Sequence, residues 1–256
     1  MLDIQYVSRS FKKVLAVDNV SLSVAPGEIV GFLGPNGAGK TTTMKLAVGL
    51  LRPDRGRVLV CGHDVQIAPA QARTVLGYIP DVPALYPRLT GWETLDFVGD
   101  AFRLEPAEKI RKAHELVDLF GLGEWMTRQV ETYSHGTRQK LAWAASLLHD
   151  PQVLLLDEPT VGLDPANSRL IKDVIVLLKQ RGCAILMSSH LLPMVEELAD
   201  RMVMISRGRL VAEGTLAQLR ESAAAAGHVS LEEMFLKLTG TAEQSEKAAG
   251  LLGKGR

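Results

Sequence analysis

The sequence predicts an α/β protein with a mainly parallel sheet, an antiparallel β subdomain and an inserted α-helical subdomain. Residues 1–30 contain short alternating apolar runs that end at Pro26-Gly27, a pattern typical of antiparallel strands closed by a turn. From Thr90 to Leu148 the apolar residues follow helical spacing. After Leu148, short apolar runs alternate with helical segments, which indicates crossover units and a parallel sheet. The chain has 256 residues, enough for one large domain with an inserted subdomain.

The expected elements follow from local patterns along the chain. Strands are short apolar or alternating runs bounded by turn residues, and they are expected at 14–17, 20–24, 29–33, 57–62, 75–79, 153–156, 184–188 and 202–206. Helices follow from apolar spacing of three and four residues, and they are expected at 42–48, around 110–120, and at 167–180, 194–199 and 231–238. Ala223 to Gly227 is expected to be a linker.

These elements give expected boundaries. We expect one domain over residues 1–240, with a core at 1–84 and 150–220, a helical subdomain at about 85–149 and a C-terminal helix at about 230–239. Residues 241–256 are expected to form a mobile tail.

The composition limits the class of protein. Hydrophobic residues make up 46% and charged residues 23%, which is ordinary for a soluble globular protein. Lys+Arg and Asp+Glu are equal at 29 each, so a broad nucleic-acid footprint is not expected. Cys61 and Cys183 are too few for a disulfide framework and indicate a reducing compartment. No secretory signal is visible and no apolar run reaches the roughly 18 residues of a membrane span, so another chain would have to span the membrane.

One glycine-rich segment matches the phosphate-binding pattern G-x-x-x-x-G-K-S/T, and it reads Gly34-Pro35-Asn36-Gly37-Ala38-Gly39-Lys40-Thr41-Thr42. It lies between an expected strand and an expected helix. Such a loop forms a concave nest of backbone N–H groups, and the following helix adds the positive end of its dipole. Lys40 is expected to reach the β- and γ-phosphates, and the Thr41 hydroxyl to bind Mg²⁺. The alternative is a turn that binds nothing, but it does not explain why lysine and threonine occupy the last two positions of the pattern.

Two carboxylates end the apolar run 153–156. A buried strand that ends in Asp157 and Glu158 places both at the edge of the sheet where the phosphate loop lies. Asp157 is expected to bind Mg²⁺, and Glu158 to polarise an attacking water. The alternative is that both acids are simply solvated at the end of the strand and have no catalytic role. Beside a phosphate loop, the pair predicts a P-loop nucleoside triphosphatase core.

The segment Tyr133-Ser134-His135-Gly136-Thr137-Arg138-Gln139-Lys140-Leu141 resembles the hallmark L-S-G-G-Q of the ATP-binding cassette (ABC) family. The resemblance covers about residues 1–240. It implies that Ser134 and Gly136 contact the γ-phosphate of ATP held by an opposite subunit. A serine hydroxyl and backbone N–H groups at a helix start make a good anion clamp, whereas the residues alone favour a simple helix N-cap for Ser134.

Further motifs occur in the family's order. Pro159 to Pro165 resembles the loop through which paired subunits sense each other, with Asp164 at its acidic position. His190 stands where the family has a switch histidine on the γ-phosphate, whereas a histidine at a strand end is by itself more typical of a solvated or capping residue. Phe11 falls where the family has an aromatic residue that stacks on adenine; packing within a β-strand is the alternative.

The sequence departs from the family pattern at two places. Asp81 stands where the family usually has a glutamine that touches Mg²⁺, and it would bind the metal directly or through water. His135 and Thr137 replace a glycine and a glutamine. A His135 side chain that points to solvent is expected, with added positive charge near phosphate at low pH as the alternative.

The resemblance implies an ATP-hydrolysing subunit with ATP and Mg²⁺ at its site, at the cytoplasmic face of a membrane. It also implies a separate transmembrane permease subunit and a second copy of this chain, or a related subunit, packed head-to-tail. The ending 231–240 resembles the ABC-2-type exporter branch. Leu85, Tyr86 and Trp92 are expected either to touch the permease or to form subdomain core. The competing classes are a soluble ABC-type ATPase acting on nucleic acid or ribosomes, and a regulatory module that has lost hydrolysis.

Overall fold

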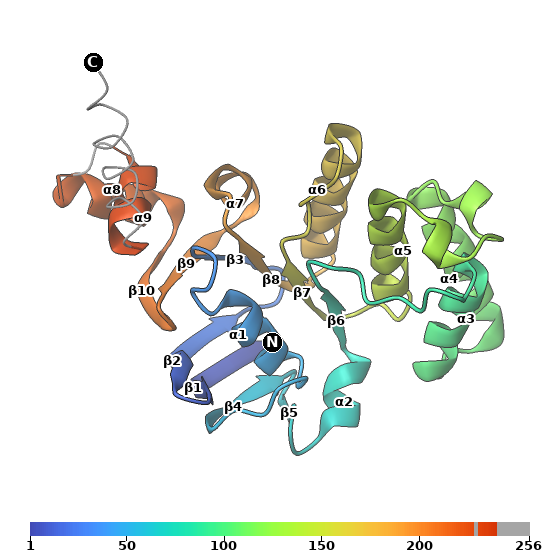
Figure 1. Cartoon of the computed structure of the whole chain (residues 1–256), viewed down its shortest axis with the longest axis horizontal. Helices are drawn as coiled ribbons and strands as arrows, with labels where there is room; N and C mark the ends of the chain where they lie inside the picture. Colours follow the sequence, from blue (N-terminus) through green and yellow to red (C-terminus); the bar gives the residue numbers. More distant parts are fainter. Residues whose placement is uncertain (228–229, 240–256) are drawn as a thin grey trace.

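The computed structural model describes residues 1–227 and 230–239, and two sheets with surrounding helices make up this part of the chain (Figure 1). The larger sheet has the strand order β10-β9-β3-β8-β7-β6, and all neighbours run parallel except β10 and β9. Its strands are β3 Ile29–Leu33, β6 Leu76–Ile79, β7 Val153–Asp157, β8 Ala184–Ser189, β9 Arg201–Ser206 and β10 Arg209–Gly214. The expected mainly parallel sheet is confirmed.

The smaller sheet is antiparallel and has the order β2-β1-β4-β5. Its strands are β1 Leu2–Phe11, β2 Val14–Val24, β4 Arg55–Val60 and β5 His63–Asp64. The β1–β2 hairpin turns at Lys12, whose φ is 55°. The antiparallel β region expected within residues 1–30 is therefore present.

The helices are α1 Lys40–Ala47, α2 Pro69–Thr74, α3 Gly91–Ala101, α4 Pro106–Leu119, α5 His135–Leu147, α6 Pro165–Gln180, α7 Leu192–Leu198, α8 Leu216–Ala225 and α9 Leu231–Thr239. One expectation is wrong: Ala223 to Ala225 end α8 and are not a linker. Thr215 and Gln218 form a capping box that starts this helix, and alanine has the highest helix propensity, so the helix continues through the alanines. The expected tail at 241–256 lies outside the described residues.

Alternate residues of the parallel strands feed two separate apolar cores. On β3, Val30 and Phe32 pack with α1 and the antiparallel sheet, whereas Ile29 and Leu33 pack with the helices of the other face. The other inner strands alternate in the same way, because side chains of a strand point to opposite faces. Helix α1 thus lies between the two sheets, which fixes its N-terminus at the edge of β3 (Figure 1).

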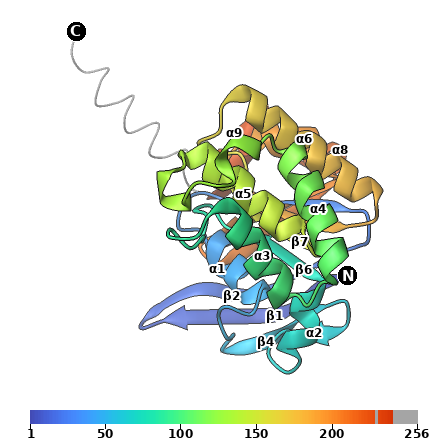
Figure 2. The same cartoon turned by 90° about the vertical axis from the view of Figure 1, so that its right-hand side faces the viewer.

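Helices α3, α4 and α5 form one group beside β6 (Figure 2). A capping box of Thr90 and Glu93 starts α3, and Ser134 caps α5. Leu85 and Trp92 pack against the core and are partly buried, whereas Tyr86 is 59% exposed and meets Phe97 edge-on. Within the described residues, no helix combines the length and apolarity that crossing a membrane requires.

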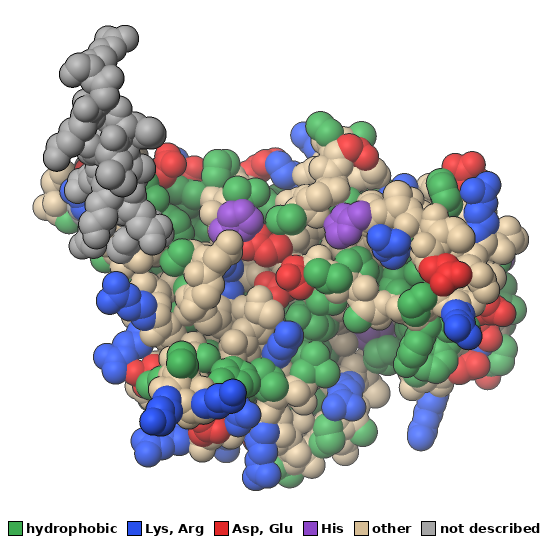
Figure 3. Space-filling model, in the orientation of Figure 1, with side chains coloured by type: hydrophobic (Ala, Val, Ile, Leu, Met, Phe, Trp, Pro, Cys, Tyr) green, Lys and Arg blue, Asp and Glu red, His purple; other side chains and the backbone are tan. Residues whose placement is uncertain are grey.

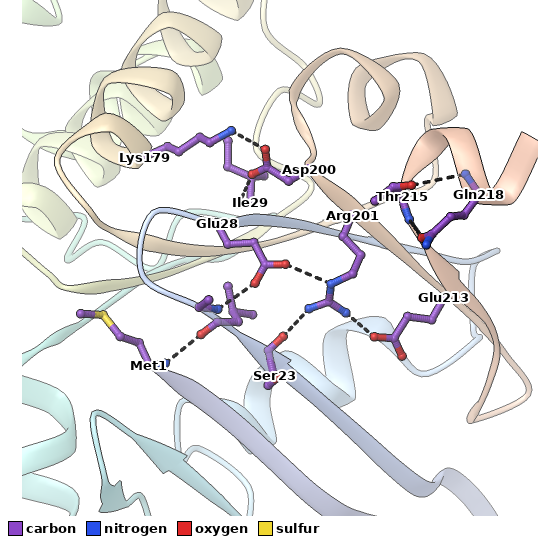
Figure 4. A network of polar contacts seen from close by, with 12 residues as sticks. Met1, Ser23, Glu28, Ile29, Lys179, Asp200, Arg201, Glu213, Thr215 and Gln218 are labelled. Carbon is purple, nitrogen blue, oxygen red and sulfur yellow. Dashed lines mark hydrogen bonds and ion pairs between the residues drawn. The ribbon is translucent and has the colours of Figure 1, made fainter.

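A polar network joins the two sheets at the end opposite the phosphate loop (Figure 4). Its centre is Arg201 at the start of β9, which donates to Glu28 (3.0 Å), to the Ser23 carbonyl (2.7 Å) and to Glu213. Next to it, Asp200 accepts a hydrogen bond from the Ile29 N–H at 2.9 Å. Arg201 of β9 thus connects β2, β10 and the residue that precedes β3 through one side chain.

Candidate functional site

The segment 34–42 folds as a loop between β3 and α1, in a conformation that depends on glycine. Gly39 is the N-cap of α1 and has a φ of 113°. A Cβ at this position would lie 2.6 Å from the Ala16 carbonyl oxygen, so a side chain would collide with β2. The loop therefore brings backbone close to β2 and presents the N-terminus of α1, where N–H groups and the helix dipole favour an anion.

Lys40 is the buried cation of this loop, with only 6% of its surface exposed. Its Nζ donates to the carbonyl of Gly34 at 2.6 Å and to that of Pro35 at 3.3 Å. Burial lowers the pKa of Lys40, while the nearby carboxylates Glu158 and Asp157 oppose that shift. The ammonium is thus held among the loop carbonyls, next to two acids.

Asp157 ends β7 and is fully buried. Its Oδ1 accepts a hydrogen bond from the Ser188 hydroxyl on β8. Its Oδ2 is buried and has no hydrogen-bond partner among the described residues. A buried carboxylate oxygen without a donor is costly, so its environment suits a cation. This orphaned oxygen, together with the Thr41 hydroxyl on the loop, fits the oxygen ligands that Mg²⁺ prefers.

Glu158 follows β7 in a left-handed conformation, with a φ of 52°. Its Oε1 lies 3.8 Å from Lys40 Nζ and 2.8 Å from Nδ1 of His190. The Ser189 hydroxyl donates to its Oε2 at 3.4 Å. Three residues predicted separately from the sequence, Lys40, Glu158 and His190, therefore meet in space.

A small cavity of about 210 Å³ lies over the loop. Its lining consists of Ala16, Pro35, Asn36, Gly37, Gly39, Lys40, Thr41, Thr42, Asp81 and Glu158. The exposed Asp81 therefore reaches this cavity from the segment after β6, with its Oδ1 accepting from the Val82 N–H at 2.8 Å. Acidic side chains gather near the centre of this face, between two histidines (Figure 3).

Eight predicted residues are not part of that lining: Gly34, Ala38, Asp157 and His190 lie next to residues that line it, whereas Ser134, Gly136, Asp164 and Phe11 belong to other parts of the described structure. Ser134 is exposed at the start of α5, where its Oγ accepts from the Thr137 N–H at 3.1 Å, and Gly136 follows it. Asp164 caps α6 and accepts from the Asn167 N–H at 2.8 Å, which holds the pKa of Asp164 below its usual value. Phe11 is 41% exposed at the end of β1, with the Arg9 guanidinium 5.1 Å from its ring centre.

The exposed His135 packs over the loop that precedes α6. A Cβ on Gly162 would lie 2.9 Å from Cδ2 of His135, so the imidazole covers that glycine. His135 is exposed, as expected, but its ring lies against Gly162 and joins the Ser134 loop to the Asp164 loop within one chain.

Sequence reasoning missed Ser188 and Ser189, which bind Asp157 and Glu158. Both serines directly precede His190 at the end of an expected strand. Because the ends of parallel strands meet at one edge of the sheet, their two hydroxyls could have been predicted to lie near the two acids. Ala16 was also missed, because nothing in the sequence shows that β2 closes over the loop.

Comparisons with known proteins identify the family of this chain. A protein-family model described as "ABC transporter" matches residues 17–161. The daunorubicin/doxorubicin resistance ATP-binding protein DrrA of Streptomyces peucetius is 41% identical over 207 residues, which are 81% of this chain and 63% of DrrA. The ABC transporter ATP-binding protein NatA of Bacillus subtilis is 39% identical over 227 residues, 87% of this chain and 92% of NatA.

A solved structure described as the ATP binding subunit of an ABC transporter has a TM-score of 0.87 and 33% identity, covering 93% of this chain and 99% of that one. The fold therefore agrees with that of a solved relative over most of the chain. This chain belongs to the ABC transporter family, as one of its ATPase cassettes.

Proposed function

We propose that this chain binds ATP at the loop 34–42 and hydrolyses it to drive an exporter, from the cytoplasmic face of the membrane and together with a separate permease subunit. The cluster of Lys40, Glu158 and His190 over the phosphate loop is the observation that carries the proposal. The drug-resistance name of DrrA supports export as the direction. The neutral balance of 29 basic and 29 acidic residues gives no support to the alternative, an ATPase acting on nucleic acid or ribosomes.

The phosphate loop is proposed to bind the triphosphate. Its contributing residues are Gly34, Pro35, Asn36, Gly37, Ala38, Gly39, Lys40, Thr41 and Thr42. Lys40 Nζ is held by two carbonyls, which are weaker partners than a phosphate oxygen, so the ammonium would turn to the β- and γ-phosphates. Phe11 would stack on the adenine, because its ring is exposed at the hairpin end.

Thr41, Asp157 and Asp81 are proposed to hold Mg²⁺. The described residues contain no cluster of three or more His, Cys, Asp or Glu side chains with metal-ligand spacing. Mg²⁺ is commonly bound by one or two carboxylates together with substrate phosphates, so a hydroxyl and one or two acids suffice. Bound there, the ion would neutralise charge on the phosphates.

Glu158 is proposed to polarise the attacking water. Its carboxylate already lies on the cavity wall, and the contacts from His190 and Ser189 hold it in place. A fixed carboxylate can accept the proton of a water aligned with the γ-phosphate. His190 would also contact that phosphate. Because α7 begins two residues later, departure of the phosphate would change a contact next to this helix.

Ser134, Gly136 and Asp164 are proposed to act on the ATP of a second copy. They lie outside the cavity of their own chain, on exposed helix starts that present N–H groups. Head-to-tail packing of two copies would enclose each ATP between one phosphate loop and the partner's Ser134. ATP hydrolysis would remove this bridge and reopen the pair.

The permease is proposed to contact the surface around Tyr86 and Phe97. Tyr86 is 59% and Phe97 50% exposed, and their rings lie 5.3 Å apart. Contiguous exposed apolar side chains are typical of surfaces that contact a partner. They follow Asp81 in the chain, so the contact would transmit the state of the nucleotide site.

The test is a purified Glu158→Gln variant incubated with ATP and Mg²⁺. We expect it to bind ATP, to lose turnover and to sediment as a dimer, because the closed state is no longer consumed. The matched control adds Lys40→Ala, which should stay monomeric. Parent-level turnover by Glu158→Gln would refute the role of Glu158. Co-purification of the parent with nucleic acid in place of a membrane protein would favour the alternative class.

A further inference from the structure

Strand β6 is an edge strand of the large sheet, and side chains of α5 and of the segment just after it cover its outer edge. The Ser146 hydroxyl donates to the carbonyl of Tyr78 at 3.0 Å. Nε2 of His149, just after the helix, lies 3.1 Å from the carbonyl of Leu76. Leu76 and Tyr78 are two residues apart, so their carbonyls point the same way, outward from the sheet. Two side chains thus occupy hydrogen-bonding positions that a further strand would otherwise fill.

Gly77 allows this close contact. It lies between the two bonded residues, and a Cβ there would be 3.2 Å from the Ser146 carbonyl oxygen and 2.8 Å from Cδ1 of Leu154. A side chain at this position would push α5 away from the strand. Gly77 and the hydrogen bonds from Ser146 and His149 together form the contact between α5 and β6, which we call the joint. The two elements lie together in both ribbon views (Figures 1 and 2).

The other helices of the group reach the same joint. The ring of Phe102, which caps α3, stacks on the His149 imidazole with a centroid distance of 3.7 Å and an interplanar angle of 12°. Lys112 of α4 forms an ion pair with Asp150. The helices α3, α4 and α5 therefore meet the core sheet at residues 149 and 150.

His149 acts here as a neutral donor. Its Nδ1 is buried and has no hydrogen-bond partner among the described residues, so the ring proton belongs on Nε2, which faces the Leu76 carbonyl. Burial lowers the pKa of His149 to about 4, which keeps the ring neutral near neutral pH.

The joint lies between two parts of the proposed ATP site. Strand β6 leads directly to Asp81 on the cavity wall, and α5 begins at Ser134. From Ser134 to His149 the helix and its end span about 20 Å at roughly 1.5 Å per residue. A tilt of about 5° at the joint would therefore move Ser134 by roughly 2 Å, enough to lose a hydrogen bond to a phosphate.

We propose that Ser146 and His149 are positioning residues: they fix α5 on β6 and thereby set where Ser134 meets the ATP of the second copy. This inference rests on the proposed head-to-tail function. The two side chains do not touch the nucleotide of their own chain. They determine the angle between the strand that leads to Asp81 and the helix that starts at Ser134.

The experiment compares His149→Leu and Ser146→Ala with His149→Gln, each added to Glu158→Gln. Gln keeps an N–H donor near the Nε2 position, whereas Leu removes it. For each protein we measure the affinity of the monomer for ATP at low protein concentration, the ATP-dependent dimerisation constant by sedimentation, and the melting temperature. We also follow hydrogen exchange of the amides of residues 134–141 without nucleotide.

We expect the monomer to bind ATP within about twofold of its parent in all variants, since the phosphate loop is untouched. Dimerisation should weaken about tenfold in His149→Leu and several-fold in Ser146→Ala, and should recover in His149→Gln, as expected for one neutral hydrogen bond each. Exchange at 134–141 should be faster in the two deletion variants and close to parent in His149→Gln.

A folded His149→Leu and Ser146→Ala that dimerise as their parent does would overturn the proposal. A lower melting temperature with unchanged dimerisation would do the same, because it would show a structural role only. If His149→Leu does not fold, Ser146→Ala decides. Failure of Glu158→Gln itself to dimerise would instead refute the proposed function, and unchanged exchange at 134–141 would then refute the joint separately.

Discussion

The buried His149 predicts a specific loss of stability in mild acid. Its pKa is lowered from 6.5 to about 4, chiefly by burial, and Lys112 adds to the shift while the Leu76 carbonyl and Asp150 oppose it. In the unfolded chain the imidazole regains its ordinary pKa. Between the two values the unfolded state binds a proton that the folded state does not. The stability that His149 contributes is therefore present above about pH 6.5 and decreases as the pH falls towards 4.

The size of the effect follows from linkage. A difference of about 2.5 pKa units corresponds to roughly 3 kcal/mol at the acid limit, at about 1.4 kcal/mol per unit. From about pH 7 to about pH 5 the expected loss in the free energy of unfolding is close to 2 kcal/mol. Such a loss is a large share of the stability of an ordinary domain.

The assay is urea unfolding of the parent and of His149→Gln at both pH values. Gln donates to Leu76 but does not titrate, so its stability should change only through the other ionisable groups, which both proteins share. The parent should lose about 2 kcal/mol more than the variant between the two pH values. Equal losses in the two proteins would refute the buried, neutral state of His149.

Other substitutions test other parts of the structure. Lys40→Ala should abolish ATP binding in calorimetry, because the loop loses its buried cation, whereas the exposed Lys45→Ala on the same helix should bind normally. Asp81→Gln and Asp81→Ala should shift the Mg²⁺ concentration needed for hydrolysis, and identical titrations would exclude a metal role. Phe11→Ala should raise the KM for ATP several-fold, and Phe11→Tyr should not, if the ring stacks on adenine. Arg201→Met should lower the free energy of unfolding by about 1–3 kcal/mol, and Arg201→Lys by less, since it keeps the charge but not the three-way donor set.

The core of the site could be predicted from the sequence because its residues are local. The loop 34–42 and the pair Asp157-Glu158 each form a continuous motif next to a buried strand, and strand ends of a parallel sheet meet at one edge. The order and direction of the strands therefore predict that the loop and the two acids lie close together. Strand β3 is buried at all five positions, so its sequence predicts a strand covered on both faces, and strand geometry then divides its side chains between the two cores.

Contacts between distant segments could not be predicted in the same way. Ser146 and His149 bond to backbone carbonyls of β6. Every residue has a backbone carbonyl, so the sequence does not show which ones accept a side-chain hydrogen bond. The α8 boundary was wrong for a different reason. A run of small residues reads as a linker, although alanine favours a helix once a capping box has started one.

The direction of Glu158 shows how backbone conformation decides the chemistry. Simple alternation along β7 would send Glu158 to the face opposite Asp157, away from a shared site. Instead the strand ends at Asp157 and Glu158 adopts a φ of 52°, which costs a non-glycine residue about 1–2 kcal/mol. The Glu158 N–H donates to the Ser188 carbonyl at 3.2 Å, and His190 and Ser189 hold its carboxylate. These contacts offset the strain, so the same serine-rich end of β8 that positions Asp157 also turns Glu158 towards Lys40.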